Sequence, residues 1–537
     1  MTSPPQPPAP PPKTALSKLV AFGQSSAFTK WMRVSLPFMN YVPLLSVAAS
    51  IALTLTLSSP TAVLCAVTAP HLLLSVCAFS RSFSFVLGCL ISDQPLMVLI
   101  PQTVFIALSL LSVLNNRSLI PSIDASENQH DKLLYVNIGV SALSIIIGAM
   151  NFVDSIKTYN NFKVSIEQSN LDANTFAASV KWYDFIKLYS LFPLPYILEE
   201  SFNNKYLSRI KQIQNATFAT RSASNVTPIL KEHVEGDKLN LSCDIYYTID
   251  DDYEKRDEPS SGKPVVLYIH GGAWMLGSKD LGVIQPFINE AVYSGYIVLS
   301  VDYRLAPSSP WPACLIDIKE CISWVRRGGV LTHVKDVEID IKTIVVAGDS
   351  AGGHLANLVI LTENLREYQP GFEKVDTAVQ GVIDMFGPSD IREPESTRKA
   401  WEECIIQKSF DLNKVDFDNA CPVTYDDRMK GLKGRGLPWL QCIGTRDGLV
   451  PIEINREYYY KLLTAMGKAF DAPLNASTSF CWGHENVVRC EIQGSFHGFC
   501  GFRSVKTQLF LKAARLLLEE VKQRKGTGGK RGGGGSI

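Results

Sequence analysis

The sequence predicts an α/β domain with a mostly parallel sheet, preceded by an all-α transmembrane region. Between residues 226 and 525, apolar runs typical of buried strands alternate with helical patterns, which is typical of a parallel sheet with helices on both faces. From Val34 to Ser80 the chain contains no Asp, Glu, Lys or Arg, which is rare in a soluble core. The chain of 537 residues is long enough for both regions.

The transmembrane prediction depends on segment length. A hydrocarbon core about 30 Å thick needs roughly 20 apolar residues per helix. Segments of this kind lie at residues 37–58, 61–79, 95–115 and 134–153. Basic residues before the first segment favour a cytosolic N-terminus. Four spans would return the chain to the cytosol, which we favour for the large domain, whereas three would place it on the other side. We expect an integral membrane protein of the endoplasmic reticulum.

Composition divides the whole chain into five regions. They are a disordered Pro-rich leader with a basic flank (1–33), the transmembrane region (34–153), a linker or lid that suits a membrane surface (154–225), the α/β domain (226–525) and a disordered Gly-rich tail (526–537). The 52 basic and 52 acidic residues balance, so charge gives no support for a nucleic-acid partner. Further lid elements are expected within residues 388–437.

The α/β domain has clear candidates for its elements. The expected strands are 265–269, 296–301, 343–347, 378–385, 438–443 and 487–492. The expected helices are 281–294, 312–327, 351–367, 398–409, 453–467 and 503–524. Residues 230–248 have period-two stretches that suit an antiparallel hairpin at the sheet edge. Ligands bind beyond the carboxyl ends of strands in such sheets, so functional residues should directly follow strands.

A serine lies at the turn between a predicted strand and a predicted helix. Gly348-Asp349-Ser350-Ala351-Gly352 fits the pattern G-x-S-x-G. This pattern describes the nucleophile elbow, a sharp turn that exposes the serine oxygen above the sheet. The two glycines allow neighbouring backbone to pack without Cβ clashes, and the following helix N-terminus favours negative charge. The alternative is an ordinary turn serine, but the strand before it and the helix after it favour a nucleophile.

A serine nucleophile needs a base, and the base needs an orienting acid. His497 follows the last predicted strand, and Asp447 follows the strand at 438–443. Each has an ordinary interpretation, as a solvated loop histidine and as a turn Asp-Gly. Their order along the chain, serine then acid then histidine, favours a catalytic triad. If Asp447 proves distant from His497, Asp384 is the next acid to consider.

The negative charge that develops on an ester carbonyl needs hydrogen-bond donors, which form an oxyanion hole. The segment "LYIHGGAW" (267–274) follows the first parallel strand. The backbone N–H groups of Gly271, Gly272, Ala273 and Ala351 are the candidate donors. A plain Gly-Gly turn is the alternative, and the neighbouring histidine is expected to support this loop rather than to act as a base.

These motifs together resemble the hormone-sensitive-lipase-like branch of the α/β-hydrolases, in family order over about 260–502. They are "HGGAW" (270–274), "DYRLAP" (302–307), "GDSAGG" (348–353), "GTRDGLVP" (444–451) and "FHGF" (496–499). The resemblance implies an α/β-hydrolase fold, ester hydrolysis through an acyl-enzyme, and no cofactor or metal. By motif match it gives the triad to Ser350, Asp447 and His497. Many members have a third glycine where this chain has Ala273.

The resulting hypothesis is a membrane-anchored serine carboxylesterase or lipase, whose partners are an apolar ester and the lipid bilayer. Alternatives on the same triad are an amidase or deacetylase and a lipid acyltransferase. A ligand-binding receptor is less favoured, since related plant receptors lack the catalytic histidine that this chain has. The sequence leaves open which ester is used, the oligomeric state, and whether Cys481 and Cys490 form a disulfide.

Overall fold

The computed structural model describes much of the chain beyond the predicted membrane region. The described residues are 146, 149–150, 152–185, 209–224, 226–249, 262–280, 285–470, 482–501 and 504–527. The leader, the first three predicted spans, most of the fourth and nearly all of the C-terminal tail lie outside these residues. Among the residues that are described, no helix has the length and apolar character needed to cross a membrane.

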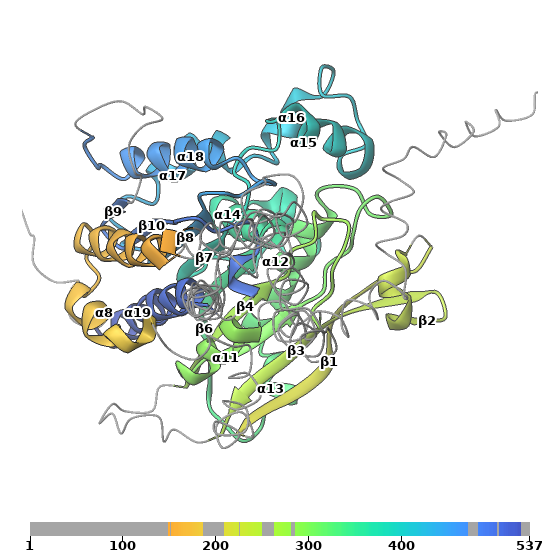
Figure 1. The fold of residues 1–537 in the computed structure, drawn as a ribbon. Coiled ribbons are helices and arrows are strands. Elements are labelled where there is room, and N and C mark those ends of the chain that lie inside the picture. The colour runs from red at the N-terminus through yellow and green to blue at the C-terminus, as the bar shows by residue number, and fades with distance from the viewer. Residues whose placement is uncertain are drawn as a thin grey trace, which may run out of the picture.

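A ten-stranded sheet forms the centre of the described part (Figure 1). Its strands are β1 (Ile210–Ser222), β2 (Val234–Glu235), β3 (Lys238–Thr248), β4 (Lys263–Ile269), β5 (Ile297–Val301), β6 (Ile339–Asp349), β7 (Gly381–Met385), β8 (Trp439–Gly444), β9 (Trp482–His484) and β10 (Val487–Ile492). The order across the sheet is β1-β3-β5-β4-β6-β7-β8-β10-β9, with β2 paired to β3. All six strands predicted between 265 and 492 are present and pair in parallel with one another, and 230–248 contains the antiparallel β2–β3 hairpin.

Two elements extend the α/β domain towards the N-terminus of its predicted range. Strand β1 pairs with β3 along its whole length, so the sheet begins at Ile210, before residue 226. Residues 152–167 are helical and contact β10. These described parts of 154–225 are therefore packed against the sheet of the α/β domain, and a lid role for this range stays a prediction. The sequence did not predict β1 because register shifts near Asn215 and Phe218 interrupt its period-two pattern.

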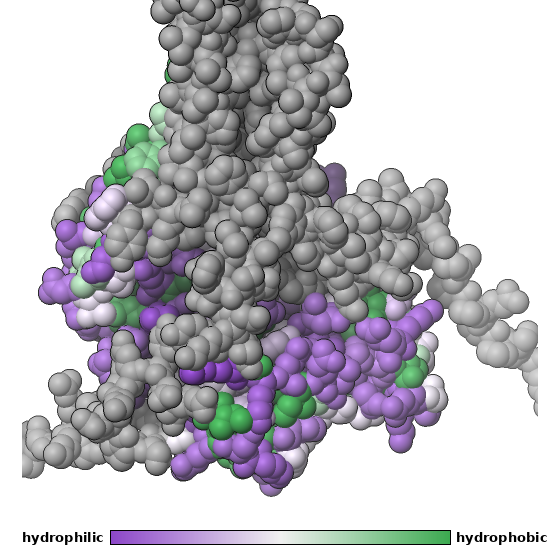
Figure 2. Space-filling model, turned by 60° about the horizontal axis from the view of Figure 1, so that its bottom comes forward, coloured by the Kyte–Doolittle hydropathy of each residue, from purple (hydrophilic) through white to green (hydrophobic). Residues whose placement is uncertain are grey.

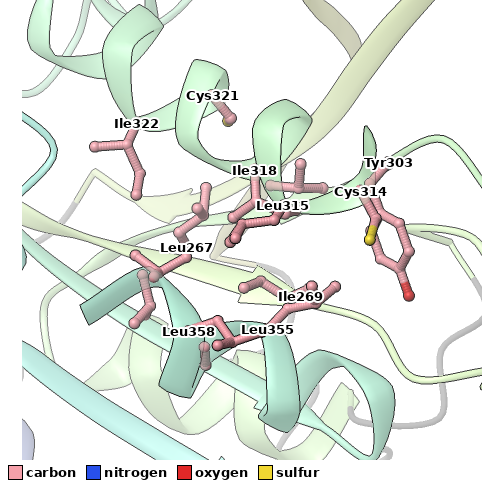
Figure 3. Close-up of a cluster of buried hydrophobic side chains, with 14 of the residues drawn as sticks. Leu267, Ile269, Tyr303, Cys314, Leu315, Ile318, Cys321, Ile322, Leu355 and Leu358 are labelled. Carbon is pink, nitrogen blue, oxygen red and sulfur yellow. The ribbon is translucent and has the colours of Figure 1, made fainter. Parts of the chain in front are cut away.

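Helices cover both faces of the sheet, and alternate residues of β4 supply both cores. Leu267 and Ile269 pack on the face covered by α12 (Ala313–Arg326) and α14 (Ala351–Leu361). In Figure 3, Leu267 and Ile269 lie between side chains of α12 and the side chains of Leu355 and Leu358 of α14. Val266 and Tyr268 pack on the opposite face with α11 (Gln285–Tyr293) and α19 (Val505–Thr527). All residues of α14 are buried, so the helix after Ser350 is held firmly in the core.

Besides these covering helices, the described part of the chain has further α-helices and one π-helical turn. They are α8 (Ala173–Ser179), α13 (Val330–His333), α15 (Glu395–Ala400), a π-helical turn η6 (Trp401–Ile405), α16 (Lys414–Asp418), α17 (Asp426–Lys430) and α18 (Ile452–Ala465). Residues 388–437, which we call the cap, carry α15 and α16 at the top of Figure 1 and α17, which lies beside α18. On the face in Figure 2, the described surface is mostly hydrophilic with scattered apolar patches, as is usual for such domains.

Candidate active site

Ser350 occupies the turn between β6 and α14. Its backbone has φ 53° and ψ −118°, a conformation that is strained for a residue other than glycine. The prediction that both motif glycines are needed for close packing is confirmed. A Cβ on Gly348 would lie 2.3 Å from the carbonyl of Gly352, and a Cβ on Gly352 would lie 2.0 Å from the Ile269 oxygen. The Ser350 N–H donates to the Met385 carbonyl at 2.8 Å, which ties the turn to β7.

The three residues expected to form a triad lie in one hydrogen-bonded chain. The Nε2 atom of His497 is 2.8 Å from Ser350 Oγ, and its Nδ1 atom is 2.7 Å from Asp447 Oδ2. Since a carboxylate only accepts, Nδ1 carries the proton and Nε2 accepts from the serine hydroxyl. The side chain of Asp447 is fully buried and that of His497 is 5% exposed. The chain therefore has the geometry that a serine nucleophile and its base require.

The acid and histidine loops hold each other in place. Asp447 Oδ1 accepts from the N–H groups of Leu449 and Val450, both at 2.9 Å, which leaves Oδ2 directed at His497. Between the loops, the Arg446 N–H donates to the Ser495 carbonyl at 2.9 Å. The imidazole also packs edge-on against Phe386, with ring centroids 4.6 Å apart. Several independent contacts thus fix the relative orientation of acid and base.

Asp384, the alternative acid, lies elsewhere. Its carboxylate accepts from Asn357 of α14 at 2.9 Å, from the Gly387 N–H at 2.8 Å and from the Tyr459 hydroxyl at 3.2 Å. Burial raises the pKa of Asp384 to about 6. These contacts connect β7, α14 and α18, so Asp384 supports the fold beneath the elbow and does not orient His497.

Of the candidate oxyanion donors, Gly271 must be withdrawn. Its N–H donates to Asp349 Oδ1 at 3.0 Å, so it is already used. Within the described part of the chain, no hydrogen bond uses the N–H of Gly272, Ala273 or Ala351. Gly272 has φ 123°, and a Cβ there would lie 2.2 Å from the Leu276 carbonyl, so only glycine fits. The position that is often a third glycine, Ala273, is exposed and has φ 51°.

Asp349 joins the oxyanion loop to the elbow. Its Oδ1 atom accepts from the Tyr268 hydroxyl at 2.5 Å as well as from Gly271. Burial raises the pKa of the Asp349 carboxyl, while the Tyr268 hydroxyl counteracts the rise by stabilising its charged form. Sequence analysis did not single out this residue. A signal was present, because Tyr268 lies on β4 three residues before the glycine pair and Asp349 lies directly before the serine.

Two histidines support the loop without reaching the triad. The prediction that His270 is a supporting residue is confirmed: its Nδ1 lies 2.8 Å from the Gly271 carbonyl and its ring stacks on Tyr303. Burial lowers the pKa of His270. Burial also lowers the pKa of His354 to about 4, so it is neutral. Its Nδ1 atom accepts from the Trp274 indole at 3.2 Å, and its Nε2–H donates to the Ala420 carbonyl of the cap at 2.7 Å.

The "DYRLAP" segment also proves structural. Asp302 Oδ1 accepts from the Lys279 N–H at 2.8 Å, and the Tyr303 hydroxyl donates to the His270 carbonyl at 2.9 Å. Arg304 forms a two-pronged contact with buried Asp317, at 2.8 Å for both hydrogen bonds. The segment therefore fastens both ends of the oxyanion loop. Over the described ranges, no group of three or more His, Cys, Asp or Glu side chains is arranged to hold a metal ion. Cys481 lies outside those ranges, so whether it pairs with Cys490 stays open.

The chain is similar to one protein family and to proteins named as esterases. A model of the family described as BD-FAE matches residues 251–462, which include Ser350 and Asp447 but end before His497. Esterase LipC of Mycobacterium tuberculosis is 29% identical over 279 residues, covering 50% of this chain and 62% of that protein. The probable carboxylic ester hydrolase LipM of the same organism is 30% identical over 204 residues, covering 37% of this chain and 44% of that protein. The chain thus matches less than two thirds of either relative.

Among solved structures, the carboxylesterase EstE1 from a metagenomic library is 21% identical, with a TM-score of 0.37. The match covers 61% of this chain and 95% of EstE1. At this TM-score the likeness carries no weight in the assignment.

Sheet order, elbow and hydrogen-bonded triad define the described domain as an α/β-hydrolase fold. Within that class, the chain is similar over residues 251–462 to the family described as BD-FAE and to relatives named as esterases.

Proposed function

We propose that this chain is a membrane-anchored serine carboxylesterase or lipase that hydrolyses an apolar ester through an acyl-enzyme. The observation that carries the proposal is the continuous hydrogen-bonded chain from Asp447 through His497 to Ser350. Relatives named as esterases support hydrolysis of ester bonds as the reaction class.

In the proposed reaction Ser350 Oγ attacks the ester carbonyl while His497 Nε2 takes the serine proton. Asp447 holds the imidazole and stabilises the imidazolium that forms. The N–H groups of Gly272, Ala273 and Ala351 act as donors to the oxyanion. Losing one such donor typically costs about 3–4 kcal/mol of transition-state stabilisation. His497 then passes its proton to the leaving alcohol. A water attacks the acyl-enzyme by the same route, which releases the acid and restores Ser350.

The apolar ester and the membrane are proposed together. Exposed apolar side chains lie just before and at the start of the helix at 152–167. They are Ile146, Met150 and Val153. These residues fall at the end of the predicted fourth span and share one helix face, and the exposed Lys157 follows one turn later. Such a change from apolar to basic residues suits a helix leaving a bilayer on its cytosolic side. An enzyme held there meets esters that partition into lipid.

The test is turnover of a panel of esters by the purified full-length protein, with acyl chains and alcohols of increasing length. We expect hydrolysis that improves with apolar length and disappears in Ser350→Ala. Ser409→Ala, at an exposed serine of the cap, serves as the control variant. A panel with no ester hydrolysed, or hydrolysis that persists in Ser350→Ala, would contradict the proposal. Adding a lipid alcohol and identifying products separates a hydrolase from an acyltransferase.

A further inference from the structure

The helix at residues 152–167 contacts β10 through three side chains on one face. Thr158, Asn161 and Ser165 are spaced at i, i+3 and i+7, which places them in a row along the helix. The Asn161 amide donates to the Glu491 carbonyl at 2.9 Å, and the Ser165 hydroxyl donates to the Arg489 carbonyl at 2.9 Å. The Thr158 hydroxyl accepts from the Gln493 N–H at 3.0 Å. Thr158 and Ser165 are completely buried.

These contacts continue the pairing of β10 along one edge. Strand β9 pairs with β10 only from Val487 to Arg489. Beyond that point, alternate residues of β10 direct their backbone groups to the same edge, where an unpaired group would need another partner. The helix supplies such partners to the Glu491 carbonyl and to the Gln493 N–H. The helix therefore completes the sheet where β10 leads into the loop of His497.

The loop between β10 and His497 is held from two sides. On one side the Gly494 N–H donates to Thr445 Oγ1 at 2.8 Å, in the loop that carries Asp447. On the other side the preceding N–H, that of Gln493, donates to Thr158. Thr158 Oγ1 is itself fixed, because its hydroxyl donates to the Asp154 carbonyl at 2.8 Å. The helix leaves little free space here, since a Cβ on Gly494 would lie 2.4 Å from Asp154 Oδ2.

We infer that Thr158 is a positioning residue for His497, through which the helix that follows the proposed membrane anchor sets the geometry of the triad. This inference rests on the proposed function. Gln493 lies four residues before His497, so a shift of its backbone displaces the imidazole relative to Ser350. Ser165 also binds the backbone of β10, but as a donor to the Arg489 carbonyl and farther from the loop. The two hydroxyls contribute alike to the packing of the helix but differ in their distance from the triad.

The experiment compares Thr158→Val, Thr158→Ser and Ser165→Ala in the full-length protein. Thr158→Val keeps the side-chain shape and leaves the Gln493 N–H without its acceptor. Because misplacing a reacting group by about 1 Å can cost 100-fold in rate, we expect kcat to fall roughly 10–100-fold with KM nearly unchanged. Thr158→Ser restores the hydroxyl and should restore kcat. Ser165→Ala should lower the unfolding midpoint about as much as Thr158→Val does while leaving kcat near the wild-type value.

Two results would overturn the inference: wild-type kcat in folded Thr158→Val, or an equal loss of kcat in Ser165→Ala. If Thr158→Val does not fold, Asn161→Ala replaces it and must lower kcat more than Ser165→Ala does. Wild-type protein that hydrolyses no ester contradicts the proposed function. In that case the rate of Ser350 labelling by a fluorophosphonate is compared across the same variants, and an unchanged rate in Thr158→Val contradicts the inference alone.

Discussion

Replacing Tyr268 with phenylalanine removes one hydroxyl from the contact between the oxyanion loop and the elbow. That hydroxyl donates to Asp349 Oδ1 at 2.5 Å, and both side chains are buried. A hydrogen bond to a charged group contributes about 1.5–3 kcal/mol. Asp349 keeps its bond from Gly271, so we expect Tyr268→Phe to lower the free energy of unfolding by about 2 kcal/mol at neutral pH. With the loop less restrained, kcat/KM should fall roughly tenfold.

The same substitution has a pH dependence of known sign. The Tyr268 hydroxyl lowers the pKa of Asp349, which burial raises. Without it the pKa rises further, so the folded variant binds a proton more readily than the wild type does. A carboxyl with a raised folded pKa favours the folded state at low pH, and this advantage is lost as pH rises through that pKa. The difference in stability between variant and wild type should therefore be smaller at acidic pH than at pH 7.

The assay is urea unfolding followed by tryptophan fluorescence, with ester hydrolysis measured on the same preparations. Tyr296→Phe is the matched control, since the buried Tyr296 hydroxyl donates to the uncharged Leu518 carbonyl at 2.7 Å. The control should lose about 1 kcal/mol and keep its kcat/KM. If Tyr268→Phe loses no more stability than Tyr296→Phe and hydrolyses esters at the wild-type rate, the structural role assigned to Asp349 is wrong.

Other substitutions test separate parts of the site. Asp447→Asn should keep the unfolding midpoint and lose on the order of 10⁴ in kcat, because the amide favours the wrong imidazole tautomer; activity within tenfold of wild type would contradict this role. Burial raises the pKa of Asp384 to about 6, so its ionisation destabilises the fold as pH rises from about 4 to 6. Asp384→Asn should remove that loss of stability, which is on the order of 3 kcal/mol. Urea unfolding of the variant and of the wild type at a series of pH values measures the difference. An unchanged pH dependence of the free energy of unfolding would contradict this prediction. The lowered pKa of His354 gives a slope of opposite sign in both proteins, which cancels in the difference. Ala273→Gly should relieve the strain at φ 51° and raise the free energy of unfolding by up to about 1 kcal/mol in urea unfolding, and a destabilised protein would show that the methyl group is needed for packing.

The elbow could be predicted from the sequence because its requirements are local. A strand, a turn with small residues and a helix occupy consecutive positions, and Gly348 and Gly352 are needed within the same few residues. The order of Asp447 and His497 followed from the strand pattern, since residues after parallel strands meet at one edge. That Ser350 and His497 come within hydrogen-bond distance agrees with this pattern.

The parts that sequence analysis missed depend on long-range contacts. Gly271 looked like an oxyanion donor until its N–H was found to bind Asp349, 78 positions along the chain. The helix at 152–167 pairs with β10 across more than 320 positions, and nothing in its own pattern indicates that partner. Strand β1 was missed because its bulges and partial exposure weaken the alternation on which strand prediction depends.

The most direct test of the central claim is to identify the residue that a fluorophosphonate modifies in the folded, full-length protein. Peptide mass spectrometry of the labelled protein should find the adduct on Ser350, with labelling abolished in Ser350→Ala and strongly slowed in His497→Ala. An adduct on another residue, or equal labelling of wild type and His497→Ala, would contradict the assignment of Ser350 as a nucleophile activated by His497.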